Sequence, residues 1–417
     1  SRPLDGITII EFATIIAAPL GVSMLADLGA RVIKVEAIGG DPFRMLGAGP
    51  YRGLFAHRMN QGKESICIDL KSLEGQQLVS KLVQGANAIV HNFRPGVPEK
   101  LGIGYESLKA VRPDLVWVSV NGYGPDGPGA QRPATHPVAG AAMGGSFIQA
   151  GFGMPPNHCA SMEERIEAAR QLMRANEANP DPNTAVVMAS STLLALLAQR
   201  RFGIGQAVYV NMLAANAWAN ADDMLSYPGK GERPLVDAEL RGFSASYRFY
   251  PTREGWVFLA LVQDREWRAF CRQADREEWI SDARFETPAA RTVHDAELRE
   301  EIKALLGEQD AQSWENEMLA AGVPLVKVDA RDPADFVVWD EHSMQNGFGP
   351  EVQHPRYGEF RRWGPLVTCD GGMETYGTSP LAGEHTDVLL EELGKGPLEI
   401  ESLRSAGVVS SESGSES

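Results

Sequence analysis

Short apolar runs rich in β-branched residues alternate with helix-like stretches through the first half of the chain, and this alternation constrains the fold most. Strands are expected at 7–12, 31–36, 86–91, 115–120 and 207–213. Helices are expected between them at 19–28, 73–83, 104–110, 161–177 and 184–201. Repeated strand–helix–strand units favour a parallel sheet covered by helices. We therefore predict an α/β fold whose large domain is a doubly wound, Rossmann-like parallel sheet.

The chain of 417 residues exceeds what one hydrophobic core usually organises, so two domains are expected. The composition shifts after about residue 222, beyond which strands mix with charged helices. We expect a large domain at 1–222, a smaller α/β domain at 223–330 and a return segment at 331–405 that completes the large domain. Residues 406–417 end in the low-complexity stretch SSESGSES and are expected to be disordered.

Composition and charge exclude several classes of protein. A net charge of −16 argues against a nucleic acid as partner. No apolar run approaches the ~20 residues that span a bilayer, and the opening SRPLDGITII has no signal pattern. The four cysteines and the histidines show no metal-ligand spacing, so no metal is expected. We expect a cytoplasmic protein that binds neither nucleic acid nor a membrane.

The most informative short stretch is NPDPNT at 179–184, directly before a strongly apolar helix. An aspartate in this place is often a helix cap, and that plain structural role fits Asp181. A carboxylate held between two prolines at the positive end of a helix also suits nucleophilic attack on a thioester carbonyl. His136 lies between two glycine-rich segments, where it could be structural or a general acid–base. The residues alone leave both questions open.

Two loops follow predicted strands, at the edge where open α/β sheets bind ligands. One contains Ala17-Ala18-Pro19, whose small residues allow a ligand to approach the backbone, although simple strand–helix packing is the favoured explanation of them. The other is HNFRPGVPEK at 91–100. There Asn92 and Phe93 could contact an adenine or pantetheine group, and Arg94 and Lys100 could hold phosphates. A solvated turn with ordinary surface charges is the alternative.

Together these segments resemble the family III CoA-transferases, a family that includes formyl-CoA and carnitine CoA-transferases and the related α-methylacyl-CoA racemases. The resemblance covers almost the whole chain and includes LADLGARVIKVE, HNFRPGVPEKLGIGYESL and GEHTDVLLEELG. The stretch RRFGIGQ at 200–206 matches the family motif R-x-T-G-x-G-Q, except that Phe202 replaces threonine. Counting back along the helix from this motif without a gap places the family's catalytic aspartate at Asp181.

The resemblance also implies contacts with coenzyme A. Together with Ala17 and Arg94 of the loops above, the implied contacts are Ile15, Ile16, Ile68, Leu70, Asn92, Phe93, Val97, Lys100 and Leu101. Some members carry a basic residue after the second strand where this chain has Ala37, and we expect Arg44 to compensate. Gly140, Gly144 and Gly145 are candidates for backbone donors to an oxyanion.

The implied reaction moves coenzyme A from an acyl-CoA donor to a carboxylic acid acceptor. It passes through an aspartyl mixed anhydride and an aspartyl-CoA thioester on Asp181, with no metal or ATP. The family fold implies an intertwined homodimer. Residues 151–180 exceed the usual link before the aspartate, and we interpret them as an insertion over the active-site entrance. No tetraglycine loop occurs in 225–245, which argues against formyl and oxalate substrates.

Two other functions remain open. A racemase of this family would use a His–Asp pair on opposite faces of the substrate, here His136 and Asp181. The family's racemase histidine falls in a Gly-His-Asp triplet, whereas this chain has Ala134-Thr135-His136, with the histidine one residue late. A catalytically silent CoA-binding module, as part of a longer tandem chain, is the second alternative.

Overall fold

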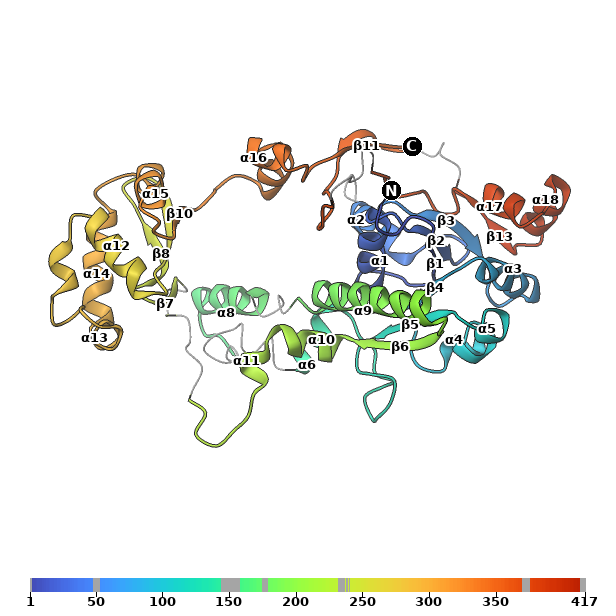
Figure 1. Ribbon diagram of the computed structural model, residues 1–417, viewed down its shortest axis with the longest axis horizontal. Coiled ribbons are helices and arrows are strands. Elements are labelled where there is room, and N and C mark those ends of the chain that lie inside the picture. Colours follow the sequence, from blue (N-terminus) through green and yellow to red (C-terminus); the bar gives the residue numbers. More distant parts are fainter. Residues whose placement is uncertain are drawn as a thin grey trace. The chain divides into compact units, whose positions relative to one another are not determined.

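The computed structural model describes residues 2–47, 53–143, 158–174, 179–231, 237, 239, 241–369 and 376–412. The chain divides into a large unit, residues 1–225 with 333–417, and a small unit, residues 226–332 (Figure 1). The expected boundaries at 222 and 330 lie within a few residues of these divisions.

The described part of the large unit contains a seven-stranded sheet in the order β13-β3-β2-β1-β4-β5-β6. Six of its strands pair in parallel: β1 (Thr8–Glu11), β2 (Arg31–Glu36), β3 (Glu64–Ile68), β4 (Ala88–His91), β5 (Val116–Asn121) and β6 (Gln206–Asn211). The order 3-2-1-4-5-6 is that of the doubly wound Rossmann sheet. The predicted α/β class with a large parallel sheet is confirmed.

The seventh strand corrects an expectation about the end of the chain. Residues from 406 were expected to be disordered, but β13 (Val409–Ser410) pairs antiparallel with Cys67–Ile68 of β3. Val408 and Val409 are both buried against the sheet. The two valines gain by burying apolar surface and by covering the exposed edge of β3. The polar stretch that follows them obscured this short strand in the sequence.

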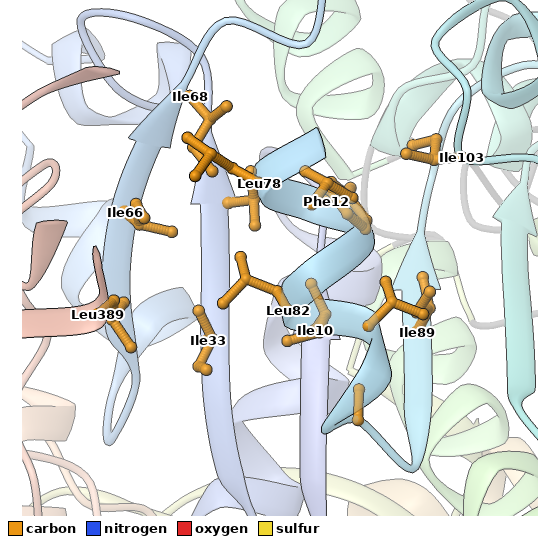
Figure 2. Packing of buried hydrophobic residues seen from close by; sticks show 14 of the residues in the cluster. Ile10, Phe12, Ile33, Ile66, Ile68, Leu78, Leu82, Ile89, Ile103 and Leu389 are labelled. Atoms are coloured by element: carbon orange, nitrogen blue, oxygen red, sulfur yellow. The ribbon is translucent and has the colours of Figure 1, made fainter. Parts of the chain in front are cut away.

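Helices cover both faces of the sheet, as a doubly wound fold requires. On one face, Leu78 and Leu82 of α3 (Leu73–Gln84) pack with Ile10, Ile33 and Ile89 of the strands (Figure 2). The same face carries α5 (Tyr105–Val111), α17 (Thr386–Glu392) and α18 (Pro397–Ser405). On the other face, α1 (Ala17–Asp27) and α9 (Pro180–Phe202) pack with alternate strand residues, among them Ile9, Val32 and Val118.

The pair formed by α1 and α9 determines where Asp181 lies. A Cβ on Gly21 of α1 would lie 2.6 Å from the carbonyl oxygen of Ala185 of α9, so only glycine permits this close approach. The helix expected from residue 184 begins four positions earlier at Pro180. Asn179 precedes it in the left-handed conformation with φ 49°, and proline is well suited to the first helical position. Asp181 is therefore inside the first turn rather than before the helix.

The remaining elements complete the described large unit. They are η1 (Pro42–Met45), α2 (Leu54–Asn60), α4 (Val97–Lys100), α6 (His136–Ala142), α8 (Met162–Arg174), α10 (Met212–Ala219), α11 (Ala221–Met224), η4 (Asp335–Trp339), α16 (Glu341–Gln345), β11 (Glu351–His354) and β12 (Gly358–Arg361). Within the described ranges, no helix combines the length and the apolar character needed to cross a membrane.

The small unit is an antiparallel sheet covered by helices. Its strands, in the order β10-β9-β8-β7, are β10 (Leu325–Lys327), β9 (Trp256–Ala260), β8 (Tyr247–Pro251) and β7 (Gly242–Ser244). Its helices are α12 (Asp264–Gln273), η3 (Glu277–Ile280), α13 (Pro288–Val293), α14 (Asp295–Leu306) and α15 (Ala311–Ala320). Trp267, Phe270, Leu298 and Trp314 form much of its core with the inner face of the sheet.

Candidate active site

A cavity of about 250 Å³ opens at the carboxyl edge of the parallel sheet. The order of strands reverses between β1 and β4, so this is the switch point at which open α/β sheets bind ligands. The loops after β1, β4 and β5, and the start of α10 directly after β6, all contribute to its wall. The lining residues are Thr14, Ile15, Ile16, Ala17, Asn92, Arg94, Val120, Asn121, Gly122, Ala130, Arg132, Ala134, Thr135, His136, Asp181 and Met212.

Four helices begin at this cavity. Ala17, His136 and Met212 are the first residues of α1, α6 and α10, and Asp181 is the second residue of α9. The first turn of a helix has unpaired N–H groups and a partial positive charge. The convergence therefore favours negative charge in the cavity, whether on a carboxylate or on an oxyanion.

A carboxylate–imidazole pair lies in the cavity wall. The Nδ1 atom of His136 lies 3.2 Å from Oδ2 of Asp181. The Asp181 side chain is 7% exposed and that of His136 is 25% exposed. His136 was expected in a loop but begins α6, since Thr135 has extended backbone and proline follows the histidine. With a proton on Nδ1, His136 donates to one carboxylate oxygen and fixes the side chain of Asp181.

Polar contacts of the residues that follow Asp181 anchor the first turn of α9. The side-chain amide of Asn183 donates to Oδ1 of Asn216 at 2.7 Å, and Asn216 is fully buried on α10. The Thr184 hydroxyl, also fully buried, donates to the Pro180 carbonyl at 2.5 Å. The sequence interpretation missed Asn216 and Thr184, because nothing in their spacing indicates which helices meet.

The predicted contacts of coenzyme A are only partly brought together. Ile15, Ile16, Ala17, Asn92 and Arg94 line the cavity with Asp181. Phe93, Leu70 and Leu101 instead pack half-buried against the core, and Ile68 is fully buried within it (Figure 2). Val97 and Lys100 lie on the short helix α4, where Lys100 is exposed.

Arg44, which was expected to bind a phosphate, makes three hydrogen bonds within the protein. Its Nη2 and Nε donate to the buried carboxylate of Glu36 at 2.6 and 2.8 Å, and its Nη1 donates to the Pro380 carbonyl at 2.7 Å. It lines a separate cavity of about 810 Å³, rather than the one that contains Asp181. Burial alone would raise the pKa of Glu36, but the Arg44 guanidinium and the Lys34 ammonium outweigh it and hold that pKa at about 2.

The remaining candidates fall near the limits of the described chain. Gly140 is buried within α6, whereas Gly144 and Gly145 lie outside the described residues. The helix expected at 161–177 is present as α8, which ends at Arg174, while the rest of the interpreted insertion is described only at 158–161 and 179–180. Among the described residues, no group of three metal-ligating side chains lies together.

One cationic residue of the cavity was missed from the sequence. Arg132 lies between the glycine-rich segments and lines the cavity with Arg94. Among the described residues, neither guanidinium has a carboxylate partner within ion-pair distance. A segment rich in glycine and proline carries no periodicity, so its fold could not be read from the pattern of apolar residues.

Comparisons with known proteins show the family of this chain. The sequence profile of CoA-transferase family III matches residues 4–386. Succinyl-CoA–D-citramalate CoA-transferase of Chloroflexus aurantiacus is 30% identical over 94% of this chain and 94% of its own. Human succinyl-CoA:glutarate CoA-transferase is 26% identical over 98% and 90%. A crystal structure of a CaiB/BaiF family protein from Brucella suis matches with a TM-score of 0.72 and 28% identity, covering 94% of this chain and 99% of that one. This chain belongs to CoA-transferase family III.

Proposed function

We propose that this CoA-transferase passes coenzyme A from an acyl-CoA to a carboxylic acid through covalent intermediates on Asp181. The observation that carries the proposal is the placement of Asp181. Its carboxylate is almost fully buried, lies in the first turn of α9 and lines the cavity at the switch point of the sheet. His136 holds one of its oxygens at 3.2 Å, and a nucleophile needs this kind of fixed orientation.

The reaction would proceed in four balanced steps. Asp181 attacks the thioester carbonyl of the donor and expels the CoA thiolate, which leaves a mixed anhydride. The thiolate attacks the aspartyl carbonyl and releases the donor acid, which leaves an aspartyl-CoA thioester. The acceptor carboxylate attacks this thioester and again expels the thiolate. The thiolate finally attacks the acceptor acyl carbonyl, which forms the new acyl-CoA and restores the carboxylate.

Each step develops negative charge on a carbonyl oxygen. The N-termini of four helices at the cavity supply a positive field for that charge. His136 keeps the carboxylate in one rotamer while the aspartyl carbonyl is attacked and re-formed. No net proton transfer is needed, since every nucleophile is an anion and every leaving group is an anion.

The cavity also carries positive charge that suits an acid acceptor. Arg132 and Arg94 both line it, and a guanidinium binds a carboxylate through two parallel hydrogen bonds. We propose that Arg132 binds the acceptor carboxylate and Arg94 the phosphates of coenzyme A. The relatives include citramalate and glutarate CoA-transferases, which supports an acid acceptor here.

The geometry of the His136–Asp181 pair favours transfer over racemisation. A racemase must place its acid and its base on opposite faces of the α-carbon. Here the two groups are 3.2 Å apart and in direct contact, so no substrate carbon fits between them. Incubation with acyl-CoA in deuterated water tests this directly. Uptake of α-deuterium without an acceptor acid would contradict the transferase mechanism.

Trapping with hydroxylamine tests the covalent intermediate. The enzyme is incubated with acyl-CoA and hydroxylamine, and mass spectrometry locates the modified carboxylate; we expect a hydroxamate on Asp181. The exposed Asp126 is the internal control and should stay unmodified. Binding of coenzyme A without any adduct would instead indicate a catalytically silent CoA-binding module.

A further inference from the structure

Ile15, in the wall of the cavity, has an unusual backbone conformation. Its φ is 71°, in the left-handed region that a β-branched residue rarely adopts. Such a conformation is strained and persists only where the surroundings impose it. Its side chain is also 41% exposed, although isoleucine gains by burial, and it lines the cavity. Some other part of the structure must therefore hold this residue in place.

The backbone around Ile15 is held by two polar side chains. The Ile15 N–H donates to the Asp41 carboxylate, at 3.3 Å to Oδ2 and 3.4 Å to Oδ1. The Asn92 side chain holds the backbone of Thr14 through both polar atoms of its amide group. Its Oδ1 accepts from the Thr14 N–H at 3.0 Å, and its Nδ2 donates to the Thr14 carbonyl at 2.7 Å. Asp41 thus contacts the strained residue, and Asn92 holds its neighbour.

Asp41 belongs to a group of four buried charged residues, which are Glu11, Lys34, Asp41 and Lys63. The Lys34 ammonium lies 3.1 Å from Asp41 and 3.2 Å from Glu11, and it donates to the Ala13 carbonyl at 2.7 Å. Lys63 lies 2.6 Å from Glu11 and donates to the Pro19 carbonyl at 2.9 Å. None of these four residues is more than 4% exposed.

These contacts fix the segment 13–19 on both sides of Ile15. Lys34 holds the carbonyl two residues before it, and Lys63 holds a carbonyl in the first turn of α1 after it. Four charges could be replaced by packed apolar residues with little loss of stability, because taking each ion out of water costs several kcal/mol. Their geometric effect on the cavity wall is therefore the more specific explanation of their presence.

We infer that Glu11, Lys34, Asp41 and Lys63 are positioning residues that hold Ile15 in its left-handed conformation and so shape the wall that receives coenzyme A. The inference rests on the proposed use of this cavity for acyl-CoA. Asp41 is the member that contacts the Ile15 N–H, and the other three orient Asp41 and the carbonyls around it. None of the four lines the cavity itself.

A double-mutant cycle between Asp41 and Ile15 tests this inference. Glycine adopts a positive φ without strain, so Ile15→Gly removes the need for an external group to hold the backbone. Affinity for free coenzyme A is measured by titration calorimetry for the full-length wild type, Asp41→Asn, Ile15→Gly and the double variant. We expect Asp41→Asn to weaken binding about tenfold in the wild-type background, and less than about threefold in the Ile15→Gly background.

A matched control and a second variant keep the test decisive. Glu64→Gln removes one of the two carboxylate partners of Arg31, an ion pair at 2.8 Å between β2 and β3 and away from the cavity, and should leave affinity unchanged. If Asp41→Asn does not fold, Asp41→Ser, whose shorter side chain withdraws the acceptor from the Ile15 N–H, replaces it in the cycle. An equal loss of affinity in both backgrounds would overturn the inference. A wild-type protein that binds no coenzyme A would instead refute the proposed function, and the inference with it.

Discussion

The Asp181 carboxylate is the single group on which the proposed chemistry depends. Asp181→Asn keeps the shape of the side chain but removes the nucleophile, so we expect transfer activity to fall at least about 10³-fold. Affinity for coenzyme A should change less than about threefold, because the other lining residues remain. Steady-state kinetics and calorimetry measure the two effects, with Asp126→Asn as the exposed control. Retention of a tenth of the activity would contradict the nucleophilic role.

Substitution of the two arginines of the cavity should affect different KM values. Arg132→Met removes a charged hydrogen-bond donor that we assign to the acceptor, so the KM for the acid should rise about tenfold, with the KM for acyl-CoA nearly unchanged. Arg94→Met should show the opposite pattern. Two-substrate kinetics over a panel of acids measures both constants. Equal effects of the two variants on both KM values would contradict the assignment.

His91, at the end of β4 beside the cavity loops, should make the fold sensitive to acid. Burial lowers the pKa of its imidazole to about 3, against an ordinary value of 6.5 in the unfolded chain. Between these values the unfolded chain binds a proton that the folded chain does not, so stability falls as the pH drops below 6.5. The contribution lost from pH 8 to pH 5 is about 2 kcal/mol.

Urea unfolding at pH 8 and pH 5 measures this effect. The variant His91→Gln keeps an acceptor for the Phe93 N–H, which donates to His91 Nδ1 at 3.2 Å in the native protein. Its loss of stability between the two pH values should be smaller than that of the wild type by about 2 kcal/mol. An identical loss in both proteins would show that His91 does not carry this part of the acid sensitivity.

At the scale of elements, the close contact between α1 and α9 determines the position of Asp181. In Gly21→Ala the new Cβ would lie 2.6 Å from the Ala185 carbonyl oxygen, so the helices must separate. We expect a loss of about 1–3 kcal/mol in the free energy of unfolding, and lower activity because Asp181 lies one turn before this contact. Gly85→Ala is the matched control, since its nearest neighbour lies at 3.7 Å. Equal melting temperatures for the two variants would contradict this packing role.

The elements also show what the sequence could predict. Five of the six parallel strands were expected from their apolar residues, and strands with both faces buried leave continuous apolar runs such as ITIIEF at 7–12. The start of α9 was missed because two prolines resemble a loop, although proline suits the first helical turn. Asp181, His136 and the loops after β1 and β4 were found from sequence. Arg132, Asn216 and the charges that hold Ile15 were not, because their role exists only in three dimensions.

At the scale of the whole molecule, the exposed apolar surface of α9 and α10 bears on assembly. Val186, Leu194 and Leu197 of α9 are 50%, 68% and 51% exposed, and Trp218 of α10 is 78% exposed. The resemblance to the family implies an intertwined homodimer, and apolar residues of this size are typical of surfaces that a partner covers. We therefore predict that the chain forms a stable dimer and that these residues lie in its interface.

Light scattering coupled to gel filtration tests the dimer, with an expected mass twice that of one chain down to nanomolar concentration. The variant Leu194→Glu places a charge where we expect the interface and should shift the mass towards a monomer or prevent folding, because intertwined chains seldom have a stable folded monomer. Leu398→Glu is the control: Leu398 is 89% exposed on α18, and its substitution should leave the mass unchanged. A compact, active monomer of the wild-type chain would refute the prediction, and would mean that one subunit alone supplies every residue that transfer requires.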